Sequence, residues 1–452
     1  MATATRPTIS IETHGCKLNQ ADSQELARRF AQAGYRVVPE ADGPDVYVLN
    51  TCTVTRMADR KARHALSRAR RHNPHALVVA TGCYAQRAPQ VLAQMPGVDR
   101  VLGNTAKNTL AQEVGRALGL PEVTCSTGSM PDDPVDAIPE ASGESTPLRT
   151  RAFVKIQEGC DQVCAYCIVP KVRGRERSIP PKLLLARAQA LREAGCQEIV
   201  LTGTQLGSYG FDLPGASLAR LLRSVLGTTD IPRLRVSSLQ PQELTPELLE
   251  LWQDPRLCPH LHLPLQSGSA TVLKAMRRRY TPQDYARAVE RIRRQVPGAS
   301  VTADVMVGFP GETEELFRES YGFCRAMEFA GLHVFPYSPR PGTSAAHLQP
   351  KVPEPLRRQR ATLLLALARR QAWEYRRRLL GTVRAVLWES GLLRTNGRTP
   401  DRMGLKVWTG YTDSYLRVAM ESSEPLANHI TRATLERLEG NLVWCRPAQG
   451  AR

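Results

Sequence analysis

The chain has 452 residues, which is room for about three domains. Its 61 Lys and Arg outnumber 43 Asp and Glu, and the net charge of +18 favours an anionic partner such as nucleic acid over a merely solvated basic surface. The chain has no run of eighteen apolar residues, and MATATRPTIS lacks the apolar segment of a signal peptide, so we expect a cytoplasmic protein without a membrane span. Its eleven cysteines then indicate metal ligation instead of disulfides.

Short apolar runs alternate with helical stretches up to about Leu118, which predicts an open, mostly parallel α/β domain at residues 1–119. The expected strands are Ile9–Glu12, Val46–Asn50, Leu77–Thr81 and Arg100–Leu102, and the expected helices are Ala21–Ala33, Thr55–His72, Pro89–Gln94 and Asn104–Leu118. Cys16, Cys52 and Cys83 each follow one of the first three strands, at the edge where parallel sheets bind ligands. On this pattern alone, a metal site and three buried small hydrophobes are equally good interpretations.

Basic residues are dense on the expected helix Thr55–His72. Arg56, Arg60, Arg63 and Arg70 share one face at helical spacing, which makes a candidate phosphate track.

The composition changes at 120–147, which is rich in Pro and acids and has no Lys or Arg. This stretch is typical of a linker, and Cys125 within it is expected to take no part in a metal site.

Six strand–helix units follow and predict a partial, parallel barrel within a domain at 148–378. The expected strands are Ala152–Gln157, Glu198–Thr202, Leu234–Ser238, His260–Leu265, Ser300–Val307 and Gly331–Phe335, and the helices between them are Pro181–Ala194, Ser217–Leu226, Thr245–Gln253, Thr281–Gln295 and Glu312–Phe329. An Arg-rich helix over 350–380, with an apolar side formed by Leu363, Leu364, Leu365 and Leu367, is expected to pack on the barrel. Arg277, Arg278 and Arg279 form a further basic cluster.

The most informative stretch is GCDQVCAYCIVP, which carries Cys160, Cys164 and Cys167 at C-x3-C-x2-C spacing after the first barrel strand. Thiolates are the usual ligands of iron–sulfur clusters, and three of them leave one iron of a [4Fe–4S] cluster open for chemistry. A zinc site is the alternative, but it needs a fourth ligand close by, and the nearest candidate, Cys196, lies far downstream.

Polar residues at other strand ends of the expected barrel face the same edge as this loop. Gln205, Ser237, Gln266 and Ser267 fit cofactor or substrate contact and ordinary turn chemistry equally well.

Residues 379–446 contain five short strand-like runs, which predict a small β-barrel. Trp388, Trp408, Tyr411 and Tyr415 alternate there with basic residues, as in barrels that stack single-stranded RNA. Core packing is the alternative for the two tryptophans.

The run Cys160–Cys167, with Tyr166 at the aromatic position, resembles the C-x3-C-x-aromatic-C signature of radical S-adenosylmethionine (SAM) enzymes. That resemblance implies that SAM binds the open iron and that Tyr166 lies near its adenine. Gln205, Ser237 and Gln266 are the further candidates for cofactor contact.

The chain as a whole resembles the methylthiotransferases, which join a three-cysteine domain, a radical SAM barrel and a TRAM barrel. HGCKLNQADS, LNTCTVT and TGCYAQ match that family's N-terminal motifs. The resemblance implies two [4Fe–4S] clusters, the second one bound by Cys16, Cys52 and Cys83.

Within the family, GCKLNQ, NTCTVT, LTGTQLGSYG, MRRRYT and LHVFPYSPRPGT are similar to the group that methylthiolates threonylcarbamoyladenosine beside the tRNA anticodon. Enzymes for isopentenyladenosine usually begin with a GCQMN-like motif, and those for a ribosomal protein with a GCPKN-like motif.

The resemblance implies that one SAM methylates sulfur at the second cluster and that another yields a radical that attacks adenine C2. A tRNA anticodon loop, an electron donor such as flavodoxin or ferredoxin and a sulfur source are the implied partners. The alternatives are isopentenyladenosine tRNA or a ribosomal protein as substrate, and a non-catalytic RNA-binding iron–sulfur or zinc protein.

Overall fold

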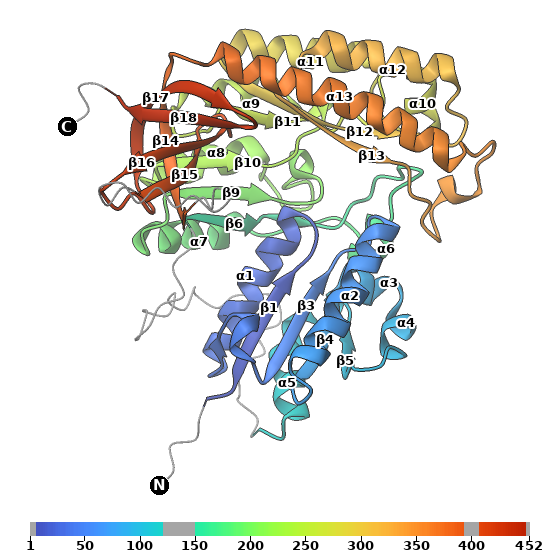
Figure 1. Cartoon of the computed structure of the whole chain (residues 1–452), viewed down its shortest axis with the longest axis vertical. Helices are drawn as coiled ribbons and strands as arrows, with labels where there is room; N and C mark the ends of the chain where they lie inside the picture. The colour runs from blue at the N-terminus through green and yellow to red at the C-terminus, as the bar shows by residue number, and fades with distance from the viewer. Residues whose placement is uncertain (1–5, 121–149, 393–405, 449–452) are drawn as a thin grey trace.

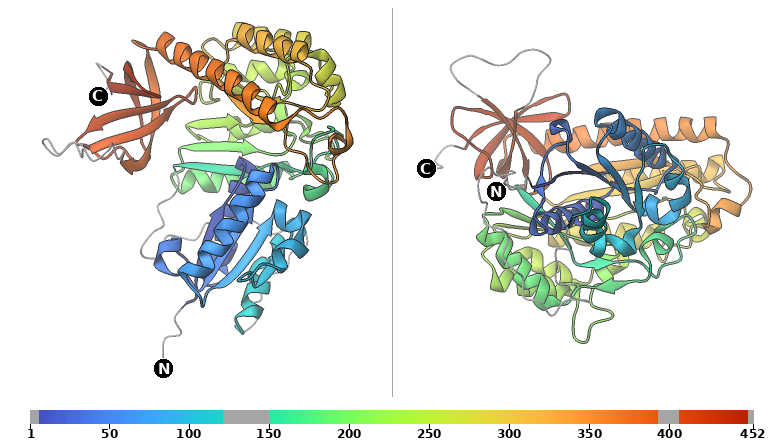
Figure 2. Two further views of the ribbon diagram at one scale, coloured as in Figure 1. Left: turned by 45° about the vertical axis from the view of Figure 1, so that its right-hand side comes forward. Right: turned by 90° about the horizontal axis from the view of Figure 1, so that it is seen from below.

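The structure is a computed structural model that describes residues 6–120, 150–392 and 406–448. Figure 1 shows an N-terminal α/β body, a central barrel-like body and a C-terminal β-barrel, and Figure 2 shows the first and last of these on neighbouring sides of the central one. Cys125 and nearly all of the predicted linker lie outside the described residues. Within the described ranges, no helix combines the length and apolar character needed to cross a membrane.

The N-terminal body is built on a five-stranded parallel sheet of order β2-β1-β3-β4-β5. Its strands are β1 (Thr8–Thr13), β2 (Arg36–Val37), β3 (Val46–Thr51), β4 (Leu77–Gly82) and β5 (Arg100–Leu102), and its α-helices are α1 (Lys17–Gln32), α2 (Arg56–His72), α3 (Cys83–Arg87), α4 (Pro89–Ala93) and α5 (Leu110–Ala117). The predicted open parallel fold is confirmed. Sequence patterns missed β2 and α3, and α1 begins at Lys17 because Cys16 takes an extended N-cap conformation.

The central strand β3 shows why the sheet forms here. All six of its residues are buried. Tyr47 and Leu49 pack with the small residues of α2, whereas Val46 and Val48 pack with Phe30 of α1 on the other face. A continuous apolar run is the pattern of a parallel strand that is covered on both faces.

The central body is an open, six-stranded parallel barrel. The sheets β10-β9-β6 and β11-β12-β13 are joined by isolated bridges at Leu234–Leu257 and Ser238–His262. Its strands are β6 (Arg151–Lys155), β9 (Glu198–Thr202), β10 (Arg233–Val236), β11 (His260–His262), β12 (Ser300–Val307) and β13 (Gly331–Pro336), with a small ribbon of β7 (Gln157–Glu158) and β8 (Arg177–Ser178). Its α-helices are α6 (Val169–Arg173), α7 (Pro181–Glu193), α8 (Leu218–Thr228), α9 (Pro246–Glu250), α10 (Ala270–Ala275), α11 (Pro282–Gln295), α12 (Glu314–Met327) and α13 (Glu354–Arg378).

This arrangement confirms the partial barrel of six strand–helix units, although β11 ends at His262 instead of Leu265. The Arg-rich helix α13 does pack on the barrel, but only Leu364 and Leu367 of its predicted apolar side are buried. Arg360 is also buried there, and its Nη1 lies 2.7 Å from Oε1 of Glu312.

The C-terminal body is a closed barrel, which confirms the predicted small β-barrel. Its strand order is β14-β15-β16-β18-β17. Its strands are β14 (Val383–Leu392), β15 (Lys406–Thr412), β16 (Arg417–Ser422), β17 (Ile430–Glu439) and β18 (Leu442–Pro447).

The aromatic residues of this barrel do not form the open stacking surface expected from the sequence. Trp388 lies in the barrel core and donates to Thr431 Oγ1 at 2.8 Å. Tyr411 and Tyr415 stack on each other, and Tyr415 also stacks on His260 of the central body at 4.8 Å between ring centroids. Tyr411 and Tyr415 therefore pack at the interface with the central body, and RNA binding by this barrel stays a prediction.

Candidate active site

The loop with Cys160, Cys164 and Cys167 follows β6 and β7 and precedes α6, at the carboxyl end of the barrel. Gly159 has a φ of +78°, and a Cβ there would lie 1.9 Å from the carbonyl oxygen of Arg175, so only glycine fits. Burial and the neighbouring thiols raise the pKa of Cys160 to about 11 and that of Cys167 to about 12. Three thiols thus turn toward one another within one short loop.

Arg278 is the cationic neighbour of this loop. Its Nη1 donates to Cys164 Sγ at 3.3 Å and its Nη2 donates to Gln240 Oε1 at 3.0 Å. Sequence patterns placed Arg278 in a basic cluster and gave no sign of this role. A guanidinium beside a thiolate is the type of contact that tunes a sulfur-ligated cluster.

Two of the predicted cofactor contacts lie close to the thiol loop. Tyr166 is partly buried and packs in a cluster that includes Met306 and Phe309. Gln205 accepts a hydrogen bond from Gln240 at 2.5 Å and so connects to Arg278, but its amide also donates to Glu243. Gln205 therefore serves a polar network of the barrel mouth.

The other two predicted contacts, Ser237 and Gln266, occupy strand ends. Ser237 is buried just after β10, and its backbone N–H donates to Leu201 at 3.1 Å. Gln266 has a φ of +65°, and its backbone bonds both Asp304 and Met306 at 2.8 Å. Both residues therefore lie at the carboxyl edge of the barrel, where the thiol loop also lies.

A second group of thiols comes from three separate loops. Cys16 caps α1 after β1, Cys52 directly follows β3 and Cys83 begins α3 after β4. Burial, together with the nearby thiols of Cys16 and Cys83, raises the pKa of Cys52 to about 11. A Cβ on Gly15 would lie 2.8 Å from Cys52 Cβ, so the first two loops are in close contact. The structure brings together the three cysteines predicted at strand ends.

Asn19 holds the first two of these loops in place. Its Nδ2 donates to the carbonyl oxygens of His14 at 2.7 Å and Thr51 at 3.0 Å, residues that flank Cys16 and Cys52. The backbone carbonyl of Asn19 in turn accepts from Asn50 at 2.9 Å.

The two thiol groups share one domain junction. Cys83 packs against Ile168, which directly follows Cys167, and against Val172 of α6. Asn104 reaches both sides, because its Nδ2 lies 3.7 Å from Cys83 Sγ and donates to the Val172 carbonyl oxygen at 2.7 Å. The thiol groups therefore face a common space between the N-terminal body and the barrel.

A buried ion network fixes this junction. Asp22 of α1 accepts from Lys107 at 2.7 Å, from Lys155 at 2.8 Å and from Arg173 at 3.1 Å, and Arg173 also donates to Glu158 at 2.7 Å. Burial alone raises the pKa of Asp22, but the three cations outweigh it and hold that pKa far below its usual range. A buried carboxylate with three partners is a rigid connection between domains.

A second buried ion pair closes the same junction from the other side. Asp59 of α2 bonds Arg87 at 2.9 Å, Thr53 Oγ1 at 2.6 Å and Arg340 of the barrel. The Arg340 and Asp59 side chains are almost completely buried. Arg340, which lies in the sequence motif LHVFPYSPRPGT, thus anchors the N-terminal body to the barrel.

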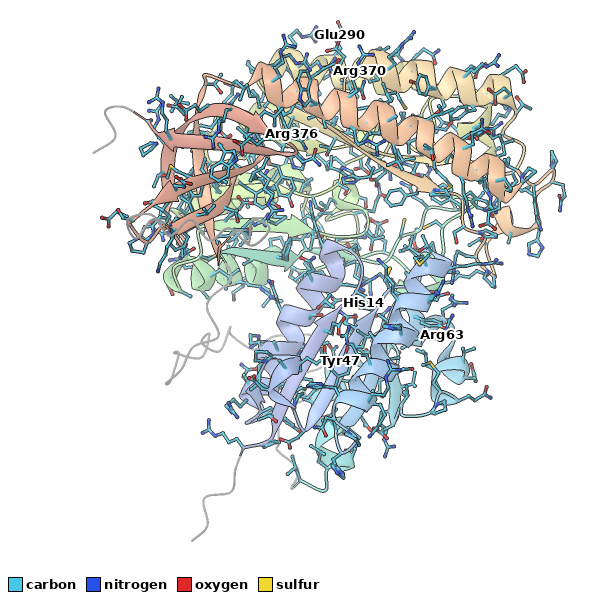
Figure 3. All side chains as sticks on the ribbon, in the orientation of Figure 1. His14, Tyr47, Arg63, Glu290, Arg370 and Arg376 are labelled. Atoms are coloured by element: carbon cyan, nitrogen blue, oxygen red, sulfur yellow. The ribbon has the colours of Figure 1, made fainter. Side chains whose placement is uncertain are left out.

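The basic face of α2 differs from the predicted stripe. Arg63 donates to Tyr84 and Arg70 pairs with Asp99, so both are used within the domain. Figure 3 shows Arg63 and His14 in the half of the N-terminal body nearer the barrel, where a cleft of about 320 Å³ lies between α2 and the end of β1. The residues that line the cleft are His14, Met57, Arg60, Lys61, His64, Ala65 and Arg68.

The spacing of the sulfur atoms tests what each thiol group can hold. A tetrahedral zinc site with Zn–S bonds of about 2.3 Å requires sulfurs within roughly 3.8 Å of one another. Among the described residues, no three thiols have all their sulfurs within 4.8 Å of one another. All six cysteines are free of disulfides, and the wider spacing fits a cluster better than a single zinc ion.

An open six-stranded barrel with a three-thiol loop after its first strand is the architecture of a radical SAM enzyme. Residues 154–324 match the model of the radical SAM superfamily, and residues 8–103 match the model described as uncharacterized protein family UPF0004. The fold is similar to that of the radical SAM methyltransferase TsrM from Kitasatospora setae, with a TM-score of 0.53 and 16% identity over 74% of this chain and 75% of that chain.

Three relatives of known name show to which family the chain belongs. The chain is 37% identical to the threonylcarbamoyladenosine tRNA methylthiotransferase MtaB of Bacillus subtilis, over 95% of this chain and 93% of the relative, and 40% identical to that of Aquifex aeolicus, over 86% and 94%. It is 35% identical to the tRNA-2-methylthio-N(6)-dimethylallyladenosine synthase of Caldicellulosiruptor saccharolyticus, over 87% and 85%. The chain belongs to the radical SAM methylthiotransferase family, whose cofactors are [4Fe–4S] clusters and SAM.

Proposed function

We propose that this enzyme converts N6-threonylcarbamoyladenosine beside the tRNA anticodon to its 2-methylthio derivative. The observation that carries the proposal is the convergence of two three-thiol groups on one space, between the N-terminal body and the mouth of a radical SAM barrel. Two MtaB relatives, 37% and 40% identical, match this chain over 93% and 94% of their own length. We assign the N-terminal body to 1–119, the radical SAM domain to 148–378 and the TRAM domain to 379–446.

Cys160, Cys164 and Cys167 are the proposed ligands of the SAM-binding cluster, and Cys16, Cys52 and Cys83 those of the second cluster. When bound, the first cluster would pass the electron for SAM cleavage and the second would hold the sulfur that is inserted. The target C–H bond at adenine C2 is not acidic enough for a side-chain base, so no residue of the chain has to remove a proton there.

The chain's own residues supply position and exclusion of water. The Asp22 and Asp59 ion networks hold the N-terminal body on the barrel, so that both thiol groups keep a fixed distance. Arg278 donates a hydrogen bond to Cys164 Sγ and brings a positive charge next to that ligand. Tyr166 lies within the loop, between Cys164 and Cys167, where it can contact SAM.

The tRNA is the partner that the relatives' names support most directly. Arg56, Arg60 and Lys61 are exposed on α2 and have no carboxylate within ion-pair distance in the described part of the chain, so they are free to bind phosphates. An anticodon-loop base must leave its stack to reach the space between the thiol groups. Flavodoxin or ferredoxin as electron donor, a separate sulfur source and a cytoplasmic location complete the proposal.

A substrate assay tests this function directly. The reconstituted enzyme, SAM and a reductant are incubated with anticodon stem-loop RNA that carries either threonylcarbamoyladenosine or isopentenyladenosine, and nucleosides are analysed by mass spectrometry. We expect the 2-methylthio product mainly from the first RNA. Product only from the second RNA would assign the enzyme to the isopentenyladenosine group, and product from neither would favour a protein substrate.

A further inference from the structure

Three side chains that the thiol groups do not use come together on neighbouring barrel strands. They are His262 of β11, Asp304 of β12 and His333 of β13, and their nitrogen and oxygen ligand atoms all lie within 4.8 Å of one another. Asp304 is directly opposite His333 in the parallel register, and His262 Nε2 lies 3.2 Å from Asp304 Oδ2. His333 is exposed, so the group is open to a ligand on one side.

This polar group faces the inside of the barrel. Along β12, Val301, Ala303, Val305 and Val307 are buried under the surrounding helices, whereas the residues between them are only partly buried. Alternate residues of a strand point to opposite faces, so Asp304 points to the interior.

The position of Asp304 along β12 places it beneath the thiol loop. Met306 on the same face packs in the cluster that holds Tyr166. Thr302 is also on that face. Its Oγ1 is hydrogen-bonded to His260 Nε2 at 3.1 Å and to His262 Nδ1 at 2.9 Å. With a rise of about 3.3 Å per residue, Asp304 lies roughly 7 Å from Met306 along the strand.

A cation from the N-terminal body enters the same region. Lys17 directly follows Cys16, and its Nζ lies 5.5 Å from the ring of Tyr415, which stacks on His260. No carboxylate lies within ion-pair distance of Lys17 in the described ranges of the chain, although the side chain is partly buried. Glu198 and Asp304 act on this amine from beyond ion-pair distance, so in the described ranges it has no direct carboxylate partner.

Charge argues against a divalent metal as the ligand of this group. Asp304 is its only carboxylate, while Lys17 Nζ lies 5.5 Å and the guanidinium of Arg235 lies 4.9 Å from the ring centroid of Tyr415. Glu198 is shared by two guanidiniums, since it pairs with Arg235 at 2.7 Å and with Arg233 at 3.5 Å. The excess of positive charge favours a ligand with one negative group and additional hydrogen-bond donors.

We propose that Lys17, His262, Asp304 and His333 form the subsite for the threonylcarbamoyl group of the target adenosine, an inference that rests on the function proposed above. That group has one carboxylate, which binds Lys17 and an N–H of His333. It also has a hydroxyl and urea N–H groups, from which Asp304 accepts hydrogen bonds. An isopentenyl group satisfies none of these side chains. Burying Lys17 against a hydrocarbon leaves its amine without a hydrogen-bond partner and leaves Asp304 with only the neighbouring histidines, so the subsite selects against that substrate.

The test compares two anticodon stem-loop RNAs that differ only in the carboxylate. One carries threonylcarbamoyladenosine and the other its methyl ester, and kcat/KM for methylthiolation is measured for each with the full-length holoenzyme. We expect the wild type to prefer the free acid by roughly 10- to 100-fold, the range of a charge-assisted hydrogen bond. Lys17→Gln should bring this ratio close to one, mainly through KM.

The matched control is Lys182→Gln on the exposed face of α7, which should keep the wild-type ratio. Because Lys17 is next to a proposed cluster ligand, His333→Leu provides an independent variant on a strand of the barrel, and it should also lower the ratio. Retention of the full ratio by both Lys17→Gln and His333→Leu would overturn the subsite.

Failure of the proposed function looks different, because the wild type would then not methylthiolate the free-acid RNA at all. A Zn²⁺ site that His333→Leu removes without any change in the acid-to-ester ratio would overturn the subsite in favour of a metal.

Discussion

The two thiol groups of this enzyme are built in opposite ways. Cys160, Cys164 and Cys167 come from one loop whose shape depends on its own turns and on Gly159. Cys16, Cys52 and Cys83 come from three loops that meet only because β1, β3 and β4 are neighbours in one parallel sheet. The first group is therefore a local feature, whereas the second depends on the whole N-terminal fold. This difference predicts how each group responds to mutation.

The largest effect is expected for the local loop. Cys164→Ala removes one ligand of the SAM-binding cluster, so 5′-deoxyadenosine formation from SAM and all methylthiolated product should fall to background. Iron analysis should show about half of the wild-type content, because a [4Fe–4S] cluster lost from one of two sites removes half of the iron. Methylthiolated tRNA from this variant would show that the loop is not the radical site.

A mutation in the second thiol group should separate SAM cleavage from sulfur insertion. Cys83→Ala is expected to keep SAM cleavage largely intact and to abolish the 2-methylthio product, since only the second cluster is lost. SAM cleavage and tRNA product are measured in the same reaction. Cys445→Ala, a buried cysteine of the C-terminal barrel, is the matched control and should retain both activities. Normal product from Cys83→Ala would remove this cysteine from the site.

The next largest effect is expected from a mutation in the Asp22 ion network at the domain junction. Asp22→Asn leaves Lys107, Lys155 and Arg173 without their shared carboxylate, and we expect a loss of about 3–5 kcal/mol in the free energy of unfolding, measured by denaturant titration at neutral pH. The second thiol group should lose iron before the local loop does. Asp230→Asn, at an exposed pair with Arg192, should change neither quantity.

The pH dependence of the Asp22 effect has a definite sign. Because the cations hold the folded-state pKa of Asp22 far below its usual range, its contribution is complete at neutral pH and declines as the pH falls below the usual range of an aspartate. The stabilities of wild type and Asp22→Asn should therefore converge in acid. A constant difference down to low pH would contradict this origin of the stability.

The smallest effect is expected for Arg278. Arg278→Met removes the hydrogen bond to Cys164 Sγ and one positive charge, and both changes should shift the reduction potential of the SAM-binding cluster to more negative values. SAM cleavage should slow by several-fold, and a redox titration followed by electron paramagnetic resonance measures the shift. Arg279→Met changes the exposed neighbour and should leave the potential unchanged.

Sequence patterns predicted the parts of this protein that depend on short stretches. Alternation of apolar and helical segments was sufficient for the open α/β domain, the six-unit barrel and the small β-barrel, because each element has its own periodicity. The cysteines could be assigned to strand ends for the same reason. The packing of Tyr411 and Tyr415 against the central body could not be predicted, because a basic–aromatic pattern does not tell whether a ring faces RNA or another domain.

The sequence by itself determined the thiol loop, the order of the domains and the resemblance to a family of enzymes. Each of these depends only on which residue types stand at which spacing along the chain. Only the tertiary structure decided which residues connect the domains and surround the space between the thiol groups. Asp22 and Lys17 lie far from Arg173 in the sequence and in a separate domain, and His262, Asp304 and His333 belong to three different strands. Such residues become partners only when strands pair in register and domains dock, because burial makes the charge of each one depend on the others.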